Sequence, residues 1–187
     1  TQQTGDLNIF DLVCESYYGI ELYNINKHGN VNIIGGWFNC TGERAGITMT
    51  DCVGVSITGA VFVNNIGSGD IGLKSALSIA NNGCSNIKMC DCLIKNQYAV
   101  NANVTGKGFL FSNNIVEIET GCSCAGSLVG TNLKNSIISN NVFNGVTLRN
   151  VRLYSNSTYS LVTNNVADGH ATGTAFQNDA GATSVLD

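Results

Sequence analysis

The sequence contains no proline, and charged residues make up only 12% of it. With a formal net charge of −4, the chain offers no basic field for a nucleic-acid partner. No apolar run in the sequence approaches the roughly 18 residues of a transmembrane helix, so membrane insertion is not expected. Apolar residues at the spacing of an amphipathic helix are also missing, which favours an all-β chain.

What the sequence does contain is a repeat with a period close to 24 residues. Self-similarity at such a period is typical of solenoid proteins. The copies are the seven segments "IFDLVCE" from Ile9, "IIGGWFN" from Ile33, "ITGAVFV" from Ile57, "MCDCLIK" from Met89, "FSNNIVE" from Phe111, "ISNNVFN" from Ile138 and "VTNNVAD" from Val162.

Two positions of the repeat are apolar in every copy and are therefore predicted to point into the core. The first position holds Ile9, Ile33, Ile57, Met89, Phe111, Ile138 and Val162. The fifth position holds Val13, Trp37, Val61, Leu93, Ile115, Val142 and Val166. Trp37 is attractive as a platform for a sugar ring, but its place in the fifth position favours a core role.

The third position of the repeat holds only Asp, Gly or Asn: Asp11, Gly35, Gly59, Asp91, Asn113, Asn140 and Asn164. These residue types enter the left-handed backbone region at the least cost, so each repeat is predicted to turn a corner there. The Asn140 amide is then able to bond to the equivalent residue one repeat away. A further strand per repeat is predicted over 19–24, 46–51, 76–81, 99–104 and 127–132.

Short strands joined by such corners describe a coil whose turns stack at the strand spacing of about 4.8 Å. We therefore predict one all-β domain over residues 1–187, a parallel β-helix of about seven coils and roughly 34 Å in length. A sandwich or propeller is the alternative, although hairpin turns do not repeat a corner at one offset. Neither end carries an obvious polar cap, so flanking domains in a longer chain are expected.

The "SNN(I/V)" segments at 112–115 and 139–142, with "TNNV" at 163–166, resemble the repeats of the right-handed parallel β-helix, or pectate-lyase-like, superfamily. Within it, the proline-poor and Asn- and Gly-rich coils are most similar to the β-helical part of a bacteriophage tailspike. The basic, proline-containing signature of pectate lyases is missing, as is the Asp-Pro-His motif of alginate-type epimerases. The polygalacturonase pattern is matched only by "DGHATG" at 168–173, without the preceding acid pair.

The resemblance to tailspikes implies a homotrimer of a virion, assembled in the bacterial cytoplasm, that binds bacterial surface polysaccharide and cleaves it by acid–base hydrolysis. One alternative is a non-catalytic stalk or receptor-binding segment of a viral fibre. The other is a secreted polysaccharide lyase or hydrolase. The shared fold does not decide between them, because the same coil serves many functions.

Candidate catalytic carboxylates are expected on the outer face of the coils. In "NIVEIET", Ile115 is predicted to point inward and Glu117 and Glu119 outward, about 7 Å apart, which suits an inverting glycosidase. Solubility is the competing explanation for two exposed glutamates. A second candidate pair is Glu43 with Asp70, from connections between strands.

The same connections, predicted to line one edge of the rod, supply the candidate sugar-binding residues, namely Glu15, Tyr17, Tyr18, Arg44, Lys74, Lys95, Tyr98, Asp168 and His170. No cofactor is expected. The eight cysteines fall mostly on strand positions and are interpreted as free, partly buried thiols that fill the core. A zinc site built from Cys90, Cys92, Cys122 and Cys124 is the less favoured interpretation, and no metal is predicted.

Overall fold

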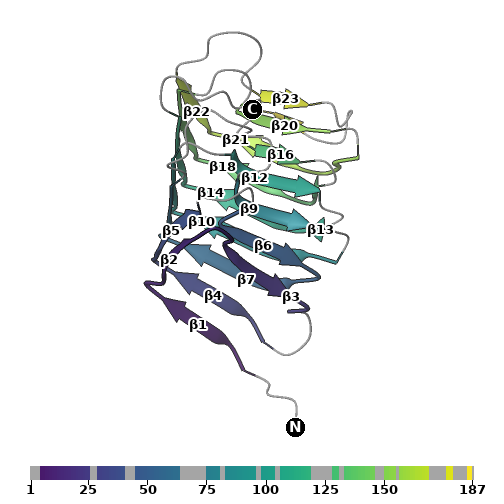
Figure 1. Cartoon of the computed structure of the whole chain (residues 1–187). Helices are drawn as coiled ribbons and strands as arrows, with labels where there is room; N and C mark the ends of the chain where they lie inside the picture. The colour runs from purple at the N-terminus through teal and green to yellow at the C-terminus, as the bar shows by residue number, and fades with distance from the viewer. Residues whose placement is uncertain are drawn as a thin grey trace.

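The computed structural model of the chain consists of parallel strands that stack along one axis (Figure 1). It describes residues 5–25, 29–40, 45–63, 75–80, 83–95, 98–103, 106–118, 128–130, 133–145, 150–154, 156–168, 176–178 and 185–186. Every regular element within these ranges is a β-strand. The predicted all-β parallel β-solenoid is confirmed, and the hairpin-based alternatives are wrong.

Three long sheets, which we call A, B and C, form the walls of the solenoid. Sheet A contains β1 (Leu7–Phe10), β4 (Val31–Ile34), β7 (Val53–Thr58), β10 (Ser85–Cys90), β14 (Phe109–Ser112), β18 (Ile137–Ser139), β21 (Leu161–Thr163) and β24 (Val185–Leu186). Sheet B contains β2 (Val13–Ser16), β5 (Trp37–Cys40), β8 (Val61–Val63), β11 (Leu93–Lys95), β15 (Ile115–Glu117), β19 (Val142–Asn144) and β22 (Val166–Asp168).

Sheet C holds the further strands that the sequence predicted. They are β3 (Ile20–Tyr23), β6 (Ile47–Thr50), β9 (Ser75–Ala80), β12 (Tyr98–Asn103), β16 (Leu128–Gly130), β20 (Val151–Leu153) and β23 (Phe176–Asn178). A short fourth sheet, D, pairs β13 (Gly106–Lys107) with β17 (Leu133–Lys134). In every sheet each strand pairs with the equivalent strand of the next coil, so equivalent side chains form files along the rod.

The corner between sheets A and B confirms the third-position prediction. All seven predicted residues have positive φ, between 47° and 70°. They also lie in a single file, because from Asp11 to Asn140 each corner N–H donates to the carbonyl that precedes the corner of the next coil. Asn113 donates to Ser139 at 3.2 Å, and Asn140 donates to Thr163 at 3.3 Å. The corner therefore repeats in register along the rod.

The ladder of side-chain amides is one residue further along than predicted. Asn140 is exposed, whereas Asn141 next to it is fully buried. The Asn114 N–H donates to Asn141 Oδ1 (2.9 Å), and the Asn141 N–H donates to Asn165 Oδ1 (3.0 Å). Adjacent asparagines thus have separate roles: the first adopts the left-handed corner, and the second satisfies buried backbone groups of neighbouring coils.

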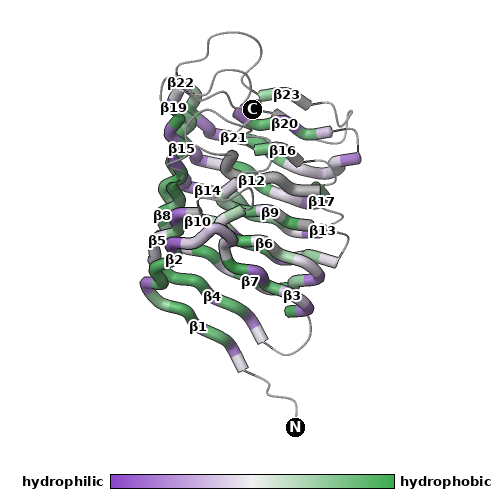
Figure 2. The backbone as a smooth tube through the Cα atoms, in the orientation of Figure 1, coloured by the Kyte–Doolittle hydropathy of each residue, from purple (hydrophilic) through white to green (hydrophobic). Residues whose placement is uncertain are grey.

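The core is filled by the first and sixth positions of the repeat. The first position is buried from Ile33 onward, as predicted. The fifth position, predicted to point inward, points outward instead, and Phe38, Phe62 and Phe143 of the sixth position are buried in its place. The corner includes two residues rather than one, so the alternation of the following strand starts outward. Figure 2 shows much of the tube of sheet B as hydrophobic, because its inward sixth position and its outward fifth position are both apolar.

Candidate functional site

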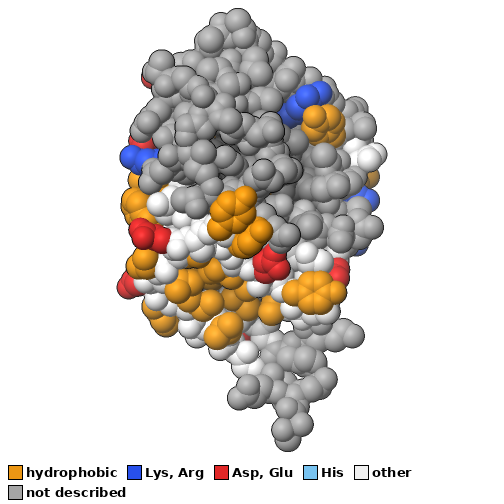
Figure 3. Space-filling model, viewed as in Figure 1, with side chains coloured by type: hydrophobic (Ala, Val, Ile, Leu, Met, Phe, Trp, Pro, Cys, Tyr) orange, Lys and Arg blue, Asp and Glu red, His pale blue; other side chains and the backbone are white. Residues whose placement is uncertain are grey.

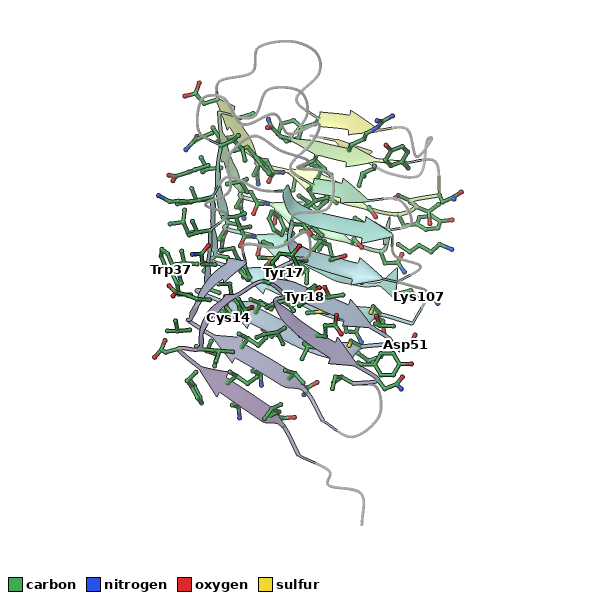
Figure 4. The ribbon with its side chains drawn as sticks, in the orientation of Figure 1. Cys14, Tyr17, Tyr18, Trp37, Asp51 and Lys107 are labelled. Carbon is green, nitrogen blue, oxygen red and sulfur yellow. The ribbon has the colours of Figure 1, made fainter. Side chains whose placement is uncertain are left out.

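The outer face of sheet B carries a continuous file of apolar side chains, which we call the apolar file. It is the fifth position of the repeat, namely Val13, Trp37, Val61, Leu93, Ile115, Val142 and Val166, paired in register from coil to coil. Val13 is 67% exposed, Trp37 40% and Val166 59%. The predicted core role of Trp37 is therefore wrong, and its indole lies on the surface at the left edge of Figure 4.

Two residues further along each strand lies a second outward file, which we call the polar file. It consists of Glu15, Asn39, Lys95, Glu117, Asn144 and Asp168, again paired in register, and it is interrupted at the third coil by the buried Val63. Four of the predicted site residues, Glu15, Lys95, Glu117 and Asp168, are therefore brought into one line. Along the left edge of Figure 3, where sheet B lies, hydrophobic side chains alternate with acidic and basic ones.

Glu117 faces a lysine within this file. Its carboxylate lies 3.1 Å from the ammonium of Lys95 one coil away, and both side chains are partly exposed. Such a solvent-exposed pair stabilises the fold little, so both groups remain available to a polar ligand. Ile115, predicted to point inward, shares the outer face with Glu117 because the buried Val116 separates them.

Tyr17 and Tyr18 lie in the connection between β2 and β3, and both are exposed. Their rings make an edge-on contact with centroids 4.8 Å apart, and the Ser16 hydroxyl donates to the Tyr18 carbonyl oxygen. Figure 4 shows both tyrosines over the middle of the front face, away from Trp37 at the edge. Both tyrosines follow the end of β2 and are not members of the register-paired polar file.

The remaining predicted site residues cannot be placed on the surface. Glu43, Arg44, Asp70, Lys74, Glu119 and His170 lie outside the described residues, as does the side chain of Tyr98, whose backbone begins β12. The proposed pairs of Glu117 with Glu119 and of Glu43 with Asp70 therefore stay predictions.

The cysteines that the structure describes are free thiols. Cys52, Cys84, Cys90 and Cys92 are buried, and three of these belong to the main core cluster, in line with the interpretation as core fillers. Burial raises the pKa of Cys92 to about 12. A hydrogen bond to Cys52, together with burial, also raises the pKa of Cys84. Neither thiol is therefore suited to act as a nucleophile at neutral pH.

The less favoured interpretation of the cysteines was a zinc site that included Cys90 and Cys92. The described part of the chain holds no group of three His, Cys, Asp or Glu side chains close enough to share a metal ion. Cys90 and Cys92 are separated by the corner residue Asp91, and the Cys90 sulfur instead contacts the Ser112 hydroxyl at 3.0 Å. The Cys92 thiol donates to the Cys90 carbonyl oxygen at 3.2 Å, so both thiols are engaged in contacts with protein groups.

Comparison of the chain with family models, curated proteins and solved structures gave no match. Nowhere in the described ranges is there a helix with the length and hydropathy to cross a membrane. The two files on sheet B bring four of the predicted site residues into one line and form the candidate functional site. In the sequence, the apolar file corresponds to the fifth position of the repeat and the polar file to the seventh position.

Proposed function

We propose that this chain binds bacterial surface polysaccharide along the outer face of sheet B, as the β-helical part of a tailspike-like virion fibre. The observation that carries the proposal is the pairing of the apolar file with the polar file. Together they form an amphipathic strip that follows the rod from β2 to β22.

The chemistry of the strip suits a sugar chain. Carboxylates and amides of Glu15, Asn144 and Asp168 are acceptors and donors for sugar hydroxyls. The Trp37 indole and the aliphatic side chains beside it offer apolar contacts to the faces of sugar rings. Since the strip is built on strands rather than loops, it is organised before the ligand arrives, which lowers the entropic cost of binding.

The single tryptophan makes this proposal testable, because Trp37 is the only indole in the sequence. Titration with purified capsular polysaccharide or lipopolysaccharide O-chains is expected to change its fluorescence. Trp37→Ala should weaken binding about tenfold, equivalent to about 1.4 kcal/mol, in calorimetry. Tyr23→Ala is the matched control, because Tyr23 is an exposed aromatic on sheet C. Equal affinity for the two variants would count against the strip.

Cleavage of the bound chain is the catalytic form of the same proposal. Glu117 and Asp168 bring carboxylates to the polar file, and Glu119, Glu43 and Asp70 are the further candidates from the sequence. New reducing ends in the incubated polysaccharide, lost in Glu117→Gln, are the expected result. An ultraviolet-absorbing unsaturated product would indicate a lyase instead, and no product at all would leave a binding fibre.

A second candidate function is a stalk segment that packs against further copies of the chain in a homotrimer. The apolar file favours it, because seven consecutive outward apolar residues resemble the core of an interface more than a solvated face. Analytical ultracentrifugation decides the matter. The stalk would be supported by a stable trimer that dissociates in the double variant Val13→Asp/Val166→Asp. The binding strip would be supported by a monomer in which added glycan changes the fluorescence of Trp37.

A further inference from the structure

The edge of the rod at sheet D places two lysines side by side. Lys107 of β13 and Lys134 of β17 are register partners in adjacent coils, and both side chains are exposed. No ion pair joins either ammonium to a carboxylate among the described residues. Like charges in directly paired positions destabilise a sheet, so this pair works against the stability of the fold.

Tyr159 adds a second local cost at the same edge. The equivalent corner position holds Gly54, Asn86, Gly108 and Asn135 in earlier coils, all with positive φ. Tyr159 adopts φ of 53° there, although a bulky side chain is rarely found in this region. Its ring is 70% exposed, so no packing offsets the strain. Backbone strain without a packing reason is characteristic of binding sites.

A second tyrosine and an arginine complete the edge. The Arg152 guanidinium lies 4.2 Å from the centroid of the Tyr154 ring. The Ser157 N–H donates to the Tyr154 carbonyl oxygen (2.8 Å), a tight turn that returns the chain toward the lysines. Thr158 then forms a parallel bridge with Lys134, which places Tyr159 one coil away from that lysine. We call Lys107, Lys134, Arg152, Tyr154 and Tyr159 the basic edge.

We propose that the basic edge binds an anionic polysaccharide. The two lysines lie on neighbouring strands, whose backbones are about 4.8 Å apart, so their ammonium groups can contact acidic groups of a chain that runs along the rod. The exposed Tyr159 ring offers a face to a sugar ring, as tyrosines do at many wet binding surfaces. Nucleic acid is the less suitable polyanion, because the protein carries a net charge of −4 and neutralises few phosphates.

The basic edge is separate from the strip on sheet B. Figure 4 shows Lys107 at the right edge of the rod and Trp37 at the left edge. The proposal therefore goes beyond glycan binding by the strip, and the two are tested by different signals. Loss of binding at one site is not expected to alter binding at the other.

The test is a fluorescence-anisotropy titration of labelled glycans with the whole chain. Polygalacturonate provides carboxylates, glycerol-phosphate teichoic acid provides phosphates, dextran is the neutral control, and single-stranded DNA represents the other polyanions. The Lys107→Gln/Lys134→Gln double variant is expected to weaken polygalacturonate binding at least tenfold. Lys88→Gln removes an exposed lysine from β10 of sheet A, outside both the strip and the basic edge, and should change the affinity less than twofold.

The variant Tyr159→Gly distinguishes an effect on glycan binding from an effect on the stability of the fold. Glycine suits a positive φ, so this variant is expected to raise the midpoint of thermal unfolding while it weakens polygalacturonate binding several-fold. If the chain binds teichoic acid and not polygalacturonate, the anionic groups of the ligand are phosphates rather than carboxylates. A loss in Lys88→Gln as large as that in Lys107→Gln/Lys134→Gln would overturn the proposal, as would binding to DNA alone. Unchanged affinity in both Tyr159→Gly and Lys107→Gln/Lys134→Gln would also overturn it.

Discussion

The corner between sheets A and B is built in two ways along the same rod. In the first three coils the residue after the corner is Leu12, Gly36 or Ala60. In the last three it is an asparagine, and these form the ladder from Asn114 to Asn165. Cys92 lies at the junction, where its N–H donates to Asn114 Oδ1 at 2.9 Å. One backbone path therefore tolerates both an apolar lining and an amide lining.

At the corner that precedes sheet A, sulfur and hydroxyl groups, rather than amides, form the hydrogen bonds to backbone N–H groups of neighbouring coils. The Cys52 N–H donates to the Cys84 sulfur at 3.3 Å, and the Leu133 N–H donates to the Ser157 hydroxyl at 3.1 Å. A side-chain amide supplies an acceptor and two donors, whereas a thiol or hydroxyl supplies an acceptor and only one donor. Each asparagine of the ladder therefore makes more hydrogen bonds to neighbouring coils than a cysteine or serine does. Replacing such an asparagine should lower the free energy of unfolding more than replacing a cysteine or serine at the other corner.

The largest effect is expected from Asn141→Ala. The Asn141 side chain accepts from the Asn114 N–H and donates to the Phe111 carbonyl (3.1 Å) and to Asn165 Oδ1 (2.8 Å). Its removal leaves buried backbone groups unpaired, so the free energy of unfolding should fall by about 3 kcal/mol. Urea denaturation followed by circular dichroism measures this loss.

The neighbouring asparagine provides the control. Asn140 is exposed and has φ of 56°, a conformation that glycine also adopts without strain. Asn140→Gly should therefore change the free energy of unfolding by less than about 0.5 kcal/mol. Similar losses in both variants would mean that the two adjacent positions do not have separate roles.

An intermediate effect is expected from the thiol that ends the ladder. The Cys92 thiol has its pKa raised from 9.0 to about 12 by burial, so it stays protonated in the folded chain while the unfolded chain loses the proton. Its contribution to stability is complete below about pH 9 and is lost as the pH rises toward 12, at about 1.4 kcal/mol per pH unit.

Cys92→Asn removes this titration and extends the ladder. The Cys92 sulfur already accepts from the Ala60 N–H and lies 4.0 Å from the Ile57 carbonyl, where the new amide would bond. Unfolding measured between pH 8 and pH 11 should therefore show a shallower decline for the variant. Parallel pH profiles for the two proteins would contradict the assignment to Cys92.

The corner was predictable because its requirement is local. A positive φ restricts the residue type whatever the surroundings, so Asp11, Gly59 and Asn164 mark the corner in the sequence itself. The direction of the side chains after the corner was not predictable in this way. It depends on whether one or two residues form the turn, and a single residue reverses every later side chain. Trp37 was assigned to the core for that reason.

The polar file was partly predictable. Glu15, Lys95, Glu117 and Asp168 were selected individually as site residues, yet all four occupy the seventh position of the repeat. Reading that column would have placed them in one line. Tyr159 gave no such signal, since its segment was not part of the repeat alignment and its positive φ follows from the stacking of coils. Strain of this kind is visible only in the folded chain.

The smallest effect is expected from Gly59→Asn at the corner file. A Cβ at Gly59 would meet nothing closer than the Gly35 N–H nitrogen at 3.9 Å, and asparagine occupies the same corner in Asn113 and Asn140. Because asparagine has less freedom than glycine in the unfolded chain, a gain of about 0.4 kcal/mol is expected in urea denaturation.

Gly145 sharpens the comparison, because it is an equally left-handed glycine with φ of 73° but without that space. A Cβ there would overlap the Ile118 carbonyl oxygen, a backbone atom that cannot move without disturbing the next coil. Gly145→Asn should therefore destabilise the chain while Gly59→Asn does not. If both substitutions were tolerated equally, backbone conformation alone, and not the approach of neighbouring coils, would determine where this solenoid requires glycine.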